Sequence, residues 1–205
     1  MTTLFLASFF KDVAGLFNGF VDGACVGKKV CFIPTAALKE KVTFYVGADR
    51  KALLKFGMDV CDLEVASASE AEITDTIAGA DYVFVSGGNT FFLLQELRRT
   101  GADRLIVEHI ASGKVYIGSS AGSVVLSKNI EYIRHMDSLD DAPGLDGDFT
   151  GLGVVDFCVV PHATNVPFKK TVQKILADCS AQNLRPISNN QAVTVTDGTT
   201  QTLTR

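Results

Sequence analysis

The pentapeptide Gly118-Ser119-Ser120-Ala121-Gly122 is the segment of this chain best suited to covalent chemistry. It follows the short apolar run 115–117 and opens a segment that is compatible with a helix. A serine held in a sharp turn from a strand into a helix needs small neighbours, because its backbone is strained and bulk would collide with the flanking elements. The pattern therefore predicts a nucleophile elbow with Ser120 as the nucleophile.

A serine hydroxyl needs a general base to attack a carbonyl carbon, and this base is usually a histidine. The chain has three histidines. His162 follows the apolar run 157–160, which places it at the carboxyl end of a predicted parallel strand, where doubly wound sheets bind their ligands. His109 lies near the end of a predicted helix, where a partly charged imidazole favours the helix dipole. His135 has no strand leading into it, so His162 is the predicted base.

The base in turn needs an orienting group, and an aspartate-rich irregular stretch between about residues 128 and 155 offers several carboxylates. Loops of this length in a compact domain are usually functional or mobile. Asp140 and Asp141 precede Ala142-Pro143, and the proline stiffens the loop around them. Either residue would complete a triad in the chain order serine, acid, histidine.

Backbone donors for a developing oxyanion are expected after the apolar run 82–85, in the segment Ser86-Gly87-Gly88-Asn89-Thr90. Its two glycines leave backbone amides uncovered at the edge of the sheet where Ser120 is expected. The predicted pair of donors is the N–H of Gly88 and the N–H of Ala121. Asn89 is counted with this site, although its residue type also suits the N-cap of the helix that follows.

The apolar runs alternate with longer segments compatible with helices, which indicates an α/β protein with a mostly parallel, doubly wound sheet between two helical layers. The helices carry apolar residues at intervals of three and four positions, and glycines end several of them. The expected strands span 3–8, 29–34, 59–64, 82–86, 114–118, 156–160 and 191–196. The expected helices span 11–21, 40–56, 70–78, 90–99, 102–112 and 167–181.

Length and composition limit the class of protein. The chain has 205 residues, of which 47% are hydrophobic, and this is enough to build one folded domain over 1–205 without disulfides. Its net charge of -4 gives no basic surface for nucleic acid or an anionic membrane, so a small molecule is the expected partner. The five cysteines lack Cys-x-x-Cys spacing and are expected to be reduced.

The start of the chain and the loop aspartates limit the options further. The apolar stretch 4–10 lacks a basic start and is too short for a signal core or a membrane span, so a cytoplasmic protein is expected. The spacing of Asp137, Asp140 and Asp141 misses the alternating ligands and the closing glutamate of an EF-hand loop. We therefore expect no metal and no cofactor.

Three separated segments carry a resemblance to a known family: Ser86-Gly87-Gly88-Asn89-Thr90, Gly118-Ser119-Ser120-Ala121-Gly122 and Pro161-His162-Ala163-Thr164-Asn165. In this order and spacing the chain resembles the aspartyl dipeptidase and cyanophycinase family of serine peptidases, over nearly its whole length. The resemblance implies a class I glutamine-amidotransferase-like α/β fold, with serine where the amidotransferases have cysteine.

Residue by residue, the resemblance implies Ser120 as nucleophile, His162 as base and Gly88 as an oxyanion donor. The family's aspartate stands two positions before a proline, which fits Asp141 in Asp141-Ala142-Pro143 and leaves Asp140 as the alternative. An arginine after the histidine segment is thought to recognise the substrate's aspartate in aspartyl dipeptidases. This chain has no arginine there, and Lys169 or Lys170 could supply the positive charge instead.

The expected function is that of a serine peptidase with a Ser-His-Asp triad, acting as a small exopeptidase or dipeptidase through an acyl-enzyme on Ser120. Two alternatives remain at the level of sequence. One is a binding or regulatory protein that keeps the fold but has lost turnover, because fold alone does not confer function. The other is an esterase with the same triad. A monomer or a homodimer is expected, with a small peptide as the substrate.

Overall fold

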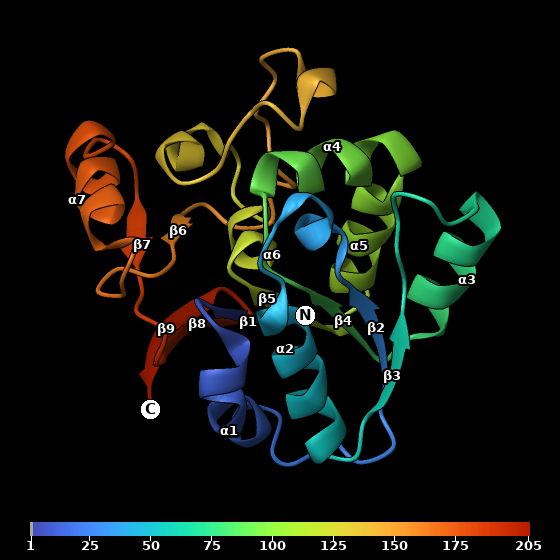
Figure 1. Ribbon diagram of the computed structural model, residues 1–205. Helices are drawn as coiled ribbons and strands as arrows, with labels where there is room; N and C mark the ends of the chain where they lie inside the picture. The colour runs from blue at the N-terminus through green and yellow to red at the C-terminus, as the bar shows by residue number, and fades with distance from the viewer. Residues whose placement is uncertain (1) are drawn as a thin grey trace.

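A seven-stranded sheet runs through the centre of the molecule, for which a computed structural model describes residues 2–205 (Figure 1). The strands lie in the order β3-β2-β4-β5-β1-β8-β9. Strands β3, β2, β4, β5 and β1 are parallel, whereas β8 and β9 run antiparallel. Their bounds are β1 Thr3–Ala7, β2 Lys29–Ile33, β3 Asp59–Asp62, β4 Tyr82–Val85, β5 Val115–Ser119, β8 Gln191–Thr196 and β9 Thr199–Thr204.

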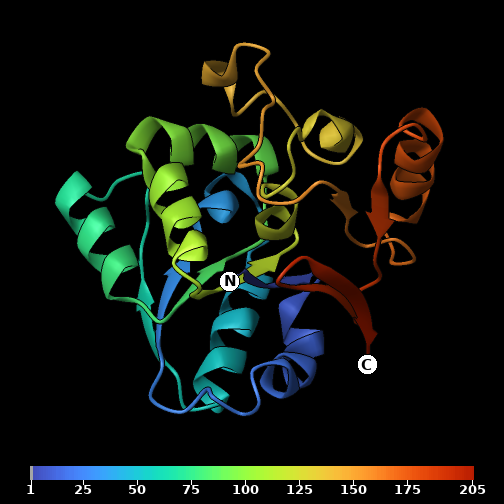
Figure 2. The ribbon, with the colours of Figure 1, turned by 180° about the vertical axis from the view of Figure 1, so that it is seen from behind.

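Helices cover both faces of this sheet, which gives the three-layer α/β/α architecture that the sequence predicts (Figures 1 and 2). One face is covered by α1 (Phe10–Phe20) and α2 (Phe44–Lys55). The other is covered by α3 (Glu70–Gly79), α4 (Thr90–Thr100) and α5 (Ala102–Ala111). Within residues 2–205, no helix is long and apolar enough to cross a membrane.

Strand β1 shows how the two apolar cores form. Side chains alternate across a strand, and both faces of this strand are covered, so its residues are apolar in sequence. Leu4 and Leu6 join the core under α3, α4 and α5, whereas Phe5 and Ala7 join the core under α1 and α2. The second core is rich in aromatic rings, such as Phe5 and Phe17, whose centroids are 5.3 Å apart in an edge-to-face arrangement.

The chain leaves the central sheet after β5 and builds a smaller unit before it returns. This unit contains the short helix α6 (Ala121–Val124), the 3-10 helices η2 (Glu131–His135) and η3 (Pro143–Leu145), and a two-stranded parallel sheet of β6 (Cys158–Val160) and β7 (Leu184–Pro186). Helix α7 (Lys169–Asp178) joins β6 to β7. The remaining 3-10 helix, η1 (Thr35–Lys39), follows β2.

Two expectations about strands are corrected by the structure. The segment expected as a strand over 156–160 forms only the three residues of β6, which pair with β7 rather than with the central sheet. It finds no place there because β8 pairs along the free side of β1. Strands β7 and β9 were not expected, since β7 is three residues long and contains Pro186, and β9 is threonine-rich and largely exposed.

The helices follow the expected order, and two of them are clearly shorter than expected. The segment expected over 40–56 forms a helix only from Phe44, and the segment expected over 167–181 forms a helix over Lys169–Asp178. The long stretch 128–155 is mostly irregular, as expected, and its regular parts are η2 and η3.

Candidate active site

Three segments of the site meet at the carboxyl edge of the parallel strands. Ser8 follows β1, Gly87 and Gly88 follow β4, and Ser120 follows β5. These strands are neighbours in the order β4-β5-β1, and parallel strands bring their carboxyl ends to one edge of the sheet. A β-carbon added to Gly87 would lie 3.2 Å from the β-carbon of Ser120, so the glycine turn lies directly against the serine.

Ser120 occupies the strained turn that the sequence predicts. Its backbone has φ 50° and ψ -108°, a conformation that costs a non-glycine residue about 1–3 kcal/mol. The turn is held from β1, because the Ser120 N–H donates to the Ala7 carbonyl at 3.0 Å and the Ser123 hydroxyl donates to the same oxygen at 2.8 Å. Gly122 is needed here, since a β-carbon on it would lie 2.1 Å from the Val85 carbonyl oxygen.

His162 meets Ser120 as the sequence predicts. Its Nε2 lies 3.1 Å from the Ser120 hydroxyl oxygen. The residue follows β6 and Pro161 and has a left-handed backbone with φ 61°, which turns the imidazole toward the edge of the central sheet. The ring of Phe168 stacks on the imidazole, with centroids 4.9 Å apart and an angle of 26° between the planes. The base therefore comes from the smaller sheet and the nucleophile from the larger one.

The second ring nitrogen of His162 contacts Asn189, not the aspartate that the sequence predicts. Its Nδ1 lies 2.7 Å from Asn189 Oδ1 and 3.2 Å from the Ser8 hydroxyl oxygen. No hydrogen bond or ion pair joins Asp141 or Asp140 to His162 within residues 2–205. Both aspartates belong to the turn before η3, where the Asp140 N–H donates to the Ser138 hydroxyl. In the structure the residues in contact follow the chain order Ser120, His162, Asn189, whereas the sequence predicts the order serine, acid, histidine.

The hydrogen bonds around His162 define its protonation. The amide oxygen of Asn189 can only accept, so Nδ1 carries the proton and donates to it. Nε2 then keeps a lone pair that can accept the Ser120 hydroxyl proton. Burial lowers the pKa of His162, and the hydrogen bond with Asn189 opposes this shift in part. A neutral imidazole with this tautomer is what a general base requires.

The glycine turn supplies amides for an oxyanion. Within residues 2–205 no hydrogen bond engages the N–H of Gly88 or the N–H of Ala121. Gly88 has φ 135°, and a β-carbon there would lie 2.1 Å from the Ala36 carbonyl oxygen, so only glycine fits. The Asn89 side chain is buried, caps α4 through the Phe92 N–H and donates to the Ser138 carbonyl, so it holds the turn that carries Gly88.

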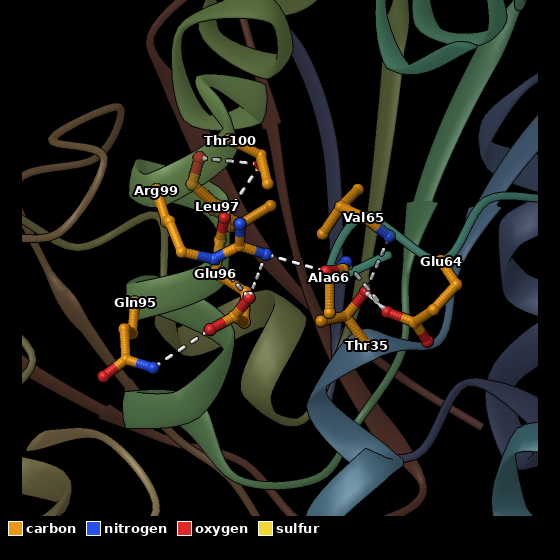
Figure 3. A network of polar contacts seen from close by, with 9 residues as sticks. All are labelled: Thr35, Glu64, Val65, Ala66, Gln95, Glu96, Leu97, Arg99 and Thr100. Carbon is orange, nitrogen blue, oxygen red and sulfur yellow. Dashed lines mark hydrogen bonds and ion pairs between the residues drawn. The ribbon is translucent and has the colours of Figure 1, made fainter. Parts of the chain in front are cut away.

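A partly buried polar network lies behind this turn and includes Thr35, Glu64 and Arg99 (Figure 3). The Thr35 hydroxyl donates to Glu64 Oε1 at 2.6 Å, and the same carboxylate oxygen accepts the Ala66 N–H. Arg99 donates to the Ala66 carbonyl at 2.7 Å and pairs with Glu96 at 2.6 Å. Thr35 begins η1, whose Ala36 carbonyl accepts the Asn89 N–H at 2.8 Å. The network therefore fixes the carbonyl against which Gly88 rests.

Two further carboxyl groups lie close to the site, and burial raises the pKa of both. Asp49 of α2 is fully buried, accepts the Lys11 N–H at 2.9 Å and has a pKa of about 7. Its neighbour Ser119, which precedes the nucleophile, accepts the Phe10 N–H. Asp137 accepts the Thr90 N–H at 2.8 Å and has a pKa of about 6.

The other two histidines lie outside the site. His109 is buried, and its Nε2 lies 3.1 Å from the Val115 carbonyl oxygen. Burial lowers the pKa of His109, so the expected charged interaction with the helix dipole does not apply. His135 is partly exposed and lies 3.0 Å from Asp178 of α7.

Sequence reasoning missed Ser8, Phe168 and Asn189. Ser8 is the first residue after an apolar run, which is a signal for the carboxyl edge of a strand. Asn189 precedes β8 by two residues and reaches the same edge because β8 is antiparallel. That direction cannot be read from the sequence of the strand alone. Phe168 gave no signal, since its contact with His162 depends on how the segment 163–168 returns over the ring.

Comparison with known proteins agrees with this geometry. The model of peptidase family S51 matches residues 4–203, nearly the whole chain. The chain belongs to peptidase family S51. It is accordingly a serine peptidase with an α/β fold, and the resemblance noted from the three sequence segments is confirmed.

Members and neighbours of the S51 family resemble the chain over different lengths. An uncharacterised peptidase of Listeria innocua is 52% identical over 198 residues, which are 96% of this chain and 94% of that protein. Peptidase E of Shewanella amazonensis is 32% identical over 134 residues, 65% of this chain and 53% of that protein. The crystal structure of a candidate peptidase E protein from Listeria monocytogenes EGD-e, 48% identical, superposes with a TM-score of 0.96 and covers 100% of this chain and 99% of its own.

Proposed function

We propose that the protein is a small exopeptidase, of the dipeptidase type, that cleaves a peptide bond through an acyl-enzyme on Ser120. The observation that carries the proposal is the 3.1 Å contact between the Ser120 hydroxyl and His162 Nε2, at a sheet edge where the Gly88 and Ala121 amides have no hydrogen-bond partner among residues 2–205. Three elements required for acyl transfer are thus gathered in one place: a nucleophile, a base and backbone donors.

In the acylation step His162 acts as the general base. Its Nε2 takes the proton of the Ser120 hydroxyl while the oxygen attacks the carbonyl carbon of the scissile bond. The bond between carbon and Ser120 oxygen forms as the carbonyl π bond breaks, which leaves a negative oxygen. Donation from Nδ1 to Asn189 keeps the imidazole in the tautomer that can accept this proton.

The negative oxygen of the tetrahedral intermediate needs preorganised donors, and each such donor typically contributes a factor of about 100–1000 to kcat. The N–H groups of Gly88 and Ala121 are assigned to this role. His162 then returns its proton to the leaving amine as the carbon–nitrogen bond breaks. A water molecule, deprotonated by His162, attacks the acyl-enzyme in the same way and releases the second product.

The relatives called peptidase E support a peptide substrate, and the chain after His162 carries positive charges that bear on its specificity. The segment that follows the base includes Val166, which is 88% exposed, and the exposed residues Lys169 and Lys170 at the start of α7. These two lysines form no ion pair within residues 2–205. We assign to these lysines, which follow His162 by seven and eight residues, the attraction of an acidic side chain of a dipeptide.

The proposal is tested with the Ser120→Ala variant and a panel of dipeptides that differ in the N-terminal residue. We expect kcat to fall by about four powers of ten or more with the fold retained, as for other serine triads. Ser180→Ala, at an exposed position outside the site, is the matched control. Dipeptide cleavage by Ser120→Ala at the rate of the wild type would refute the mechanism.

The two alternative functions are separated by different measurements. A fluorophosphonate probe should label Ser120 in the wild type and in Ser180→Ala, but not in Ser120→Ala. Failure to label under conditions that label a control hydrolase would favour a binding protein without turnover. An esterase would cleave simple esters while leaving every dipeptide of the panel intact.

The cysteines bear on the compartment in which the protein works. All five cysteines are free thiols in the structure, which supports a reducing compartment such as the cytoplasm. A monomer or a homodimer stays a prediction, and sedimentation of the purified protein would decide between them.

A further inference from the structure

The contacts of His162 consist entirely of neutral groups. Asn189 accepts from Nδ1 at 2.7 Å, the Ser8 hydroxyl lies 3.2 Å from the same nitrogen, and the Phe168 ring stacks on the imidazole. Within residues 2–205 no carboxylate forms a hydrogen bond or an ion pair with this ring. In a serine triad with aspartate, a negative charge stabilises the imidazolium that forms during the reaction. Here that charge is missing.

Phe168 can replace part of this stabilisation. Its ring centroid lies 4.9 Å from the imidazole centroid, within the distance at which a cation is attracted to the face of an aromatic ring. The attraction operates only after His162 has taken the proton, so it acts on the transition state more than on the resting enzyme. The nearly parallel rings also exclude water from one face of the imidazole.

Ser8 fixes the position of the ring through three contacts. Its hydroxyl donates to Asn189 Oδ1 at 2.9 Å, accepts the His162 backbone N–H at 2.8 Å and lies against Nδ1. Ser8 is 1% exposed and follows β1, so it ties the base to the central sheet. Asn189 is oriented in the same way, because its own N–H donates to Asn165 Oδ1 at 2.9 Å.

We propose that Asn189, Ser8 and Phe168 are positioning residues that hold His162 and stabilise its protonated form without a negative charge. This inference rests on the proposed function, since it concerns the base of that mechanism. The consequence is a base that loses its proton at a lower pH than one paired with a carboxylate, and that catalyses at mildly acidic pH. The lowered pKa of His162 agrees with this consequence.

The charged groups around the site do not change this picture. The turn after β1, the elbow after β5 and the loop before β8 contact His162 through Ser8, Ser120 and Asn189, which are all uncharged. The segment after His162 contacts it through Phe168, and the lysines that follow in α7 are exposed. Burial and Asn189 are accordingly the two causes that shift the pKa of His162.

The first experiment measures the pKa of His162 by NMR, from the chemical shift of its Cε1 proton against pH, and needs no substrate. Asn189→Asp should raise this pKa by about one unit or more, because it places a negatively charged carboxylate beside Nδ1. Phe168→Leu should lower it, whereas Phe168→Trp should retain most of the wild-type value. His135, which contacts none of the three residues in the hydrogen bonds and ion pairs of the structure, is the internal control.

The second experiment measures kcat and KM against pH with a dipeptide that the wild type cleaves. Phe168→Leu should lower kcat roughly tenfold with little change in KM, and Phe168→Trp should restore most of it. Ser8→Ala should lower kcat similarly, with partial rescue by Ser8→Thr. The acidic limb of the Asn189→Asp profile should move to higher pH together with the NMR value.

The outcomes separate this inference from the proposed function. An unchanged His162 pKa in Asn189→Asp, or equal kcat values for Phe168→Leu and Phe168→Trp, would overturn the positioning role proposed for these residues. Ser120 would remain essential in that case. Full activity of Ser120→Ala would instead overturn the proposed function, and the NMR titration would still report on the contacts of His162. Unfolding of a variant is recognised from its amide spectrum, and the Phe168→Trp and Ser8→Thr pairs then decide.

Discussion

The nucleophile and the base of this site are held in different ways. Ser120 lies in the elbow between β5 and α6, where backbone groups of three neighbouring strands fix it and residues 121–127 are all buried. His162 lies in the segment 156–190, where β6 pairs only with β7. Its link to the central sheet consists of side chains, chiefly Ser8 and Asn189.

This difference explains which parts of the site tolerate change. The elbow is specified by glycines that leave no room for a β-carbon, so its sequence is nearly forced. The segment 163–170 is largely exposed and packs against the base through Phe168. We infer that the central sheet and the contacts of His162 determine the reaction, while the exposed residues within 163–170 are free to set the substrate.

The largest expected effect comes from a change in the glycine turn of the central sheet. Gly88→Ala places a β-carbon 2.1 Å from the Ala36 carbonyl oxygen at a positive φ, so the turn must move and its amide leaves the oxyanion position. We expect a loss of kcat of at least about 100-fold, together with a lower melting temperature. Gly19→Ala, in α1 with nothing within 4 Å, is the control and should behave as the wild type. A fully active Gly88→Ala would exclude this turn from the site.

The next effect concerns the other half, where Asn189 and Asp141 compete for the same role. Asn189→Ala removes the acceptor of Nδ1, and we expect kcat to fall roughly 100-fold because the imidazole loses its tautomer and orientation. Asp141→Asn should change kcat by less than about twofold, since no contact joins it to His162 within residues 2–205. Steady-state kinetics of the two variants decide, and the reverse pattern would restore the aspartate to the triad.

A smaller effect concerns the stability of the folded protein, which should depend on pH through Asp49. The carboxyl group of Asp49 has a pKa of about 7 in the folded protein, against the ordinary value of 3.8 in an unfolded chain. The free energy of unfolding should therefore fall as the pH rises from about 4 to 7, by up to about 4 kcal/mol from this group. Asp137, with a pKa of about 6, contributes in the same direction.

Urea unfolding of Asp49→Asn at pH 4.5 and pH 7.5 measures the contribution of Asp49. The variant should resemble the wild type at the lower pH and be more stable at the higher pH, because it carries no charge to bury. Asp75→Asn, at an exposed position on α3, is the control. Equal stability of Asp49→Asn and the wild type at pH 7.5 would show that Asp49 is already paired when charged.

The smallest expected effect tests whether the exposed segment sets the substrate. Lys169→Ala and Lys170→Ala should raise KM a few-fold for dipeptides that begin with aspartate and leave KM for alanyl dipeptides unchanged, because an exposed charge pair contributes at most about 1 kcal/mol. Lys51→Ala, exposed on α2, is the matched control. The same change in KM for both kinds of dipeptide would remove the lysines from specificity.

The half of the site on the central sheet could be predicted almost completely from the sequence. Parallel strands follow from short apolar runs separated by helical segments, and their carboxyl ends must meet at one edge. The Gly-x-Ser-x-Gly pentapeptide and the double glycine at 87–88 mark the places where backbones approach too closely for side chains. The position of His162 after the end of a strand was predicted correctly. That strand, however, lies in the smaller sheet and not in the central one.

The partner of the base could not be predicted, because it depends on contacts between segments far apart in the chain. Asp141 had the residue type and the position in sequence of a triad acid, whereas Asn189 had only a place before β8. The antiparallel direction of β8 brings Asn189 beside Ser8, 181 residues away. The sequence alone thus determined the strained turn at Ser120 and the α/β class through local spacing rules. Only the tertiary structure decided that neutral groups surround the base, since side-chain contacts across the sheet edge leave no local pattern.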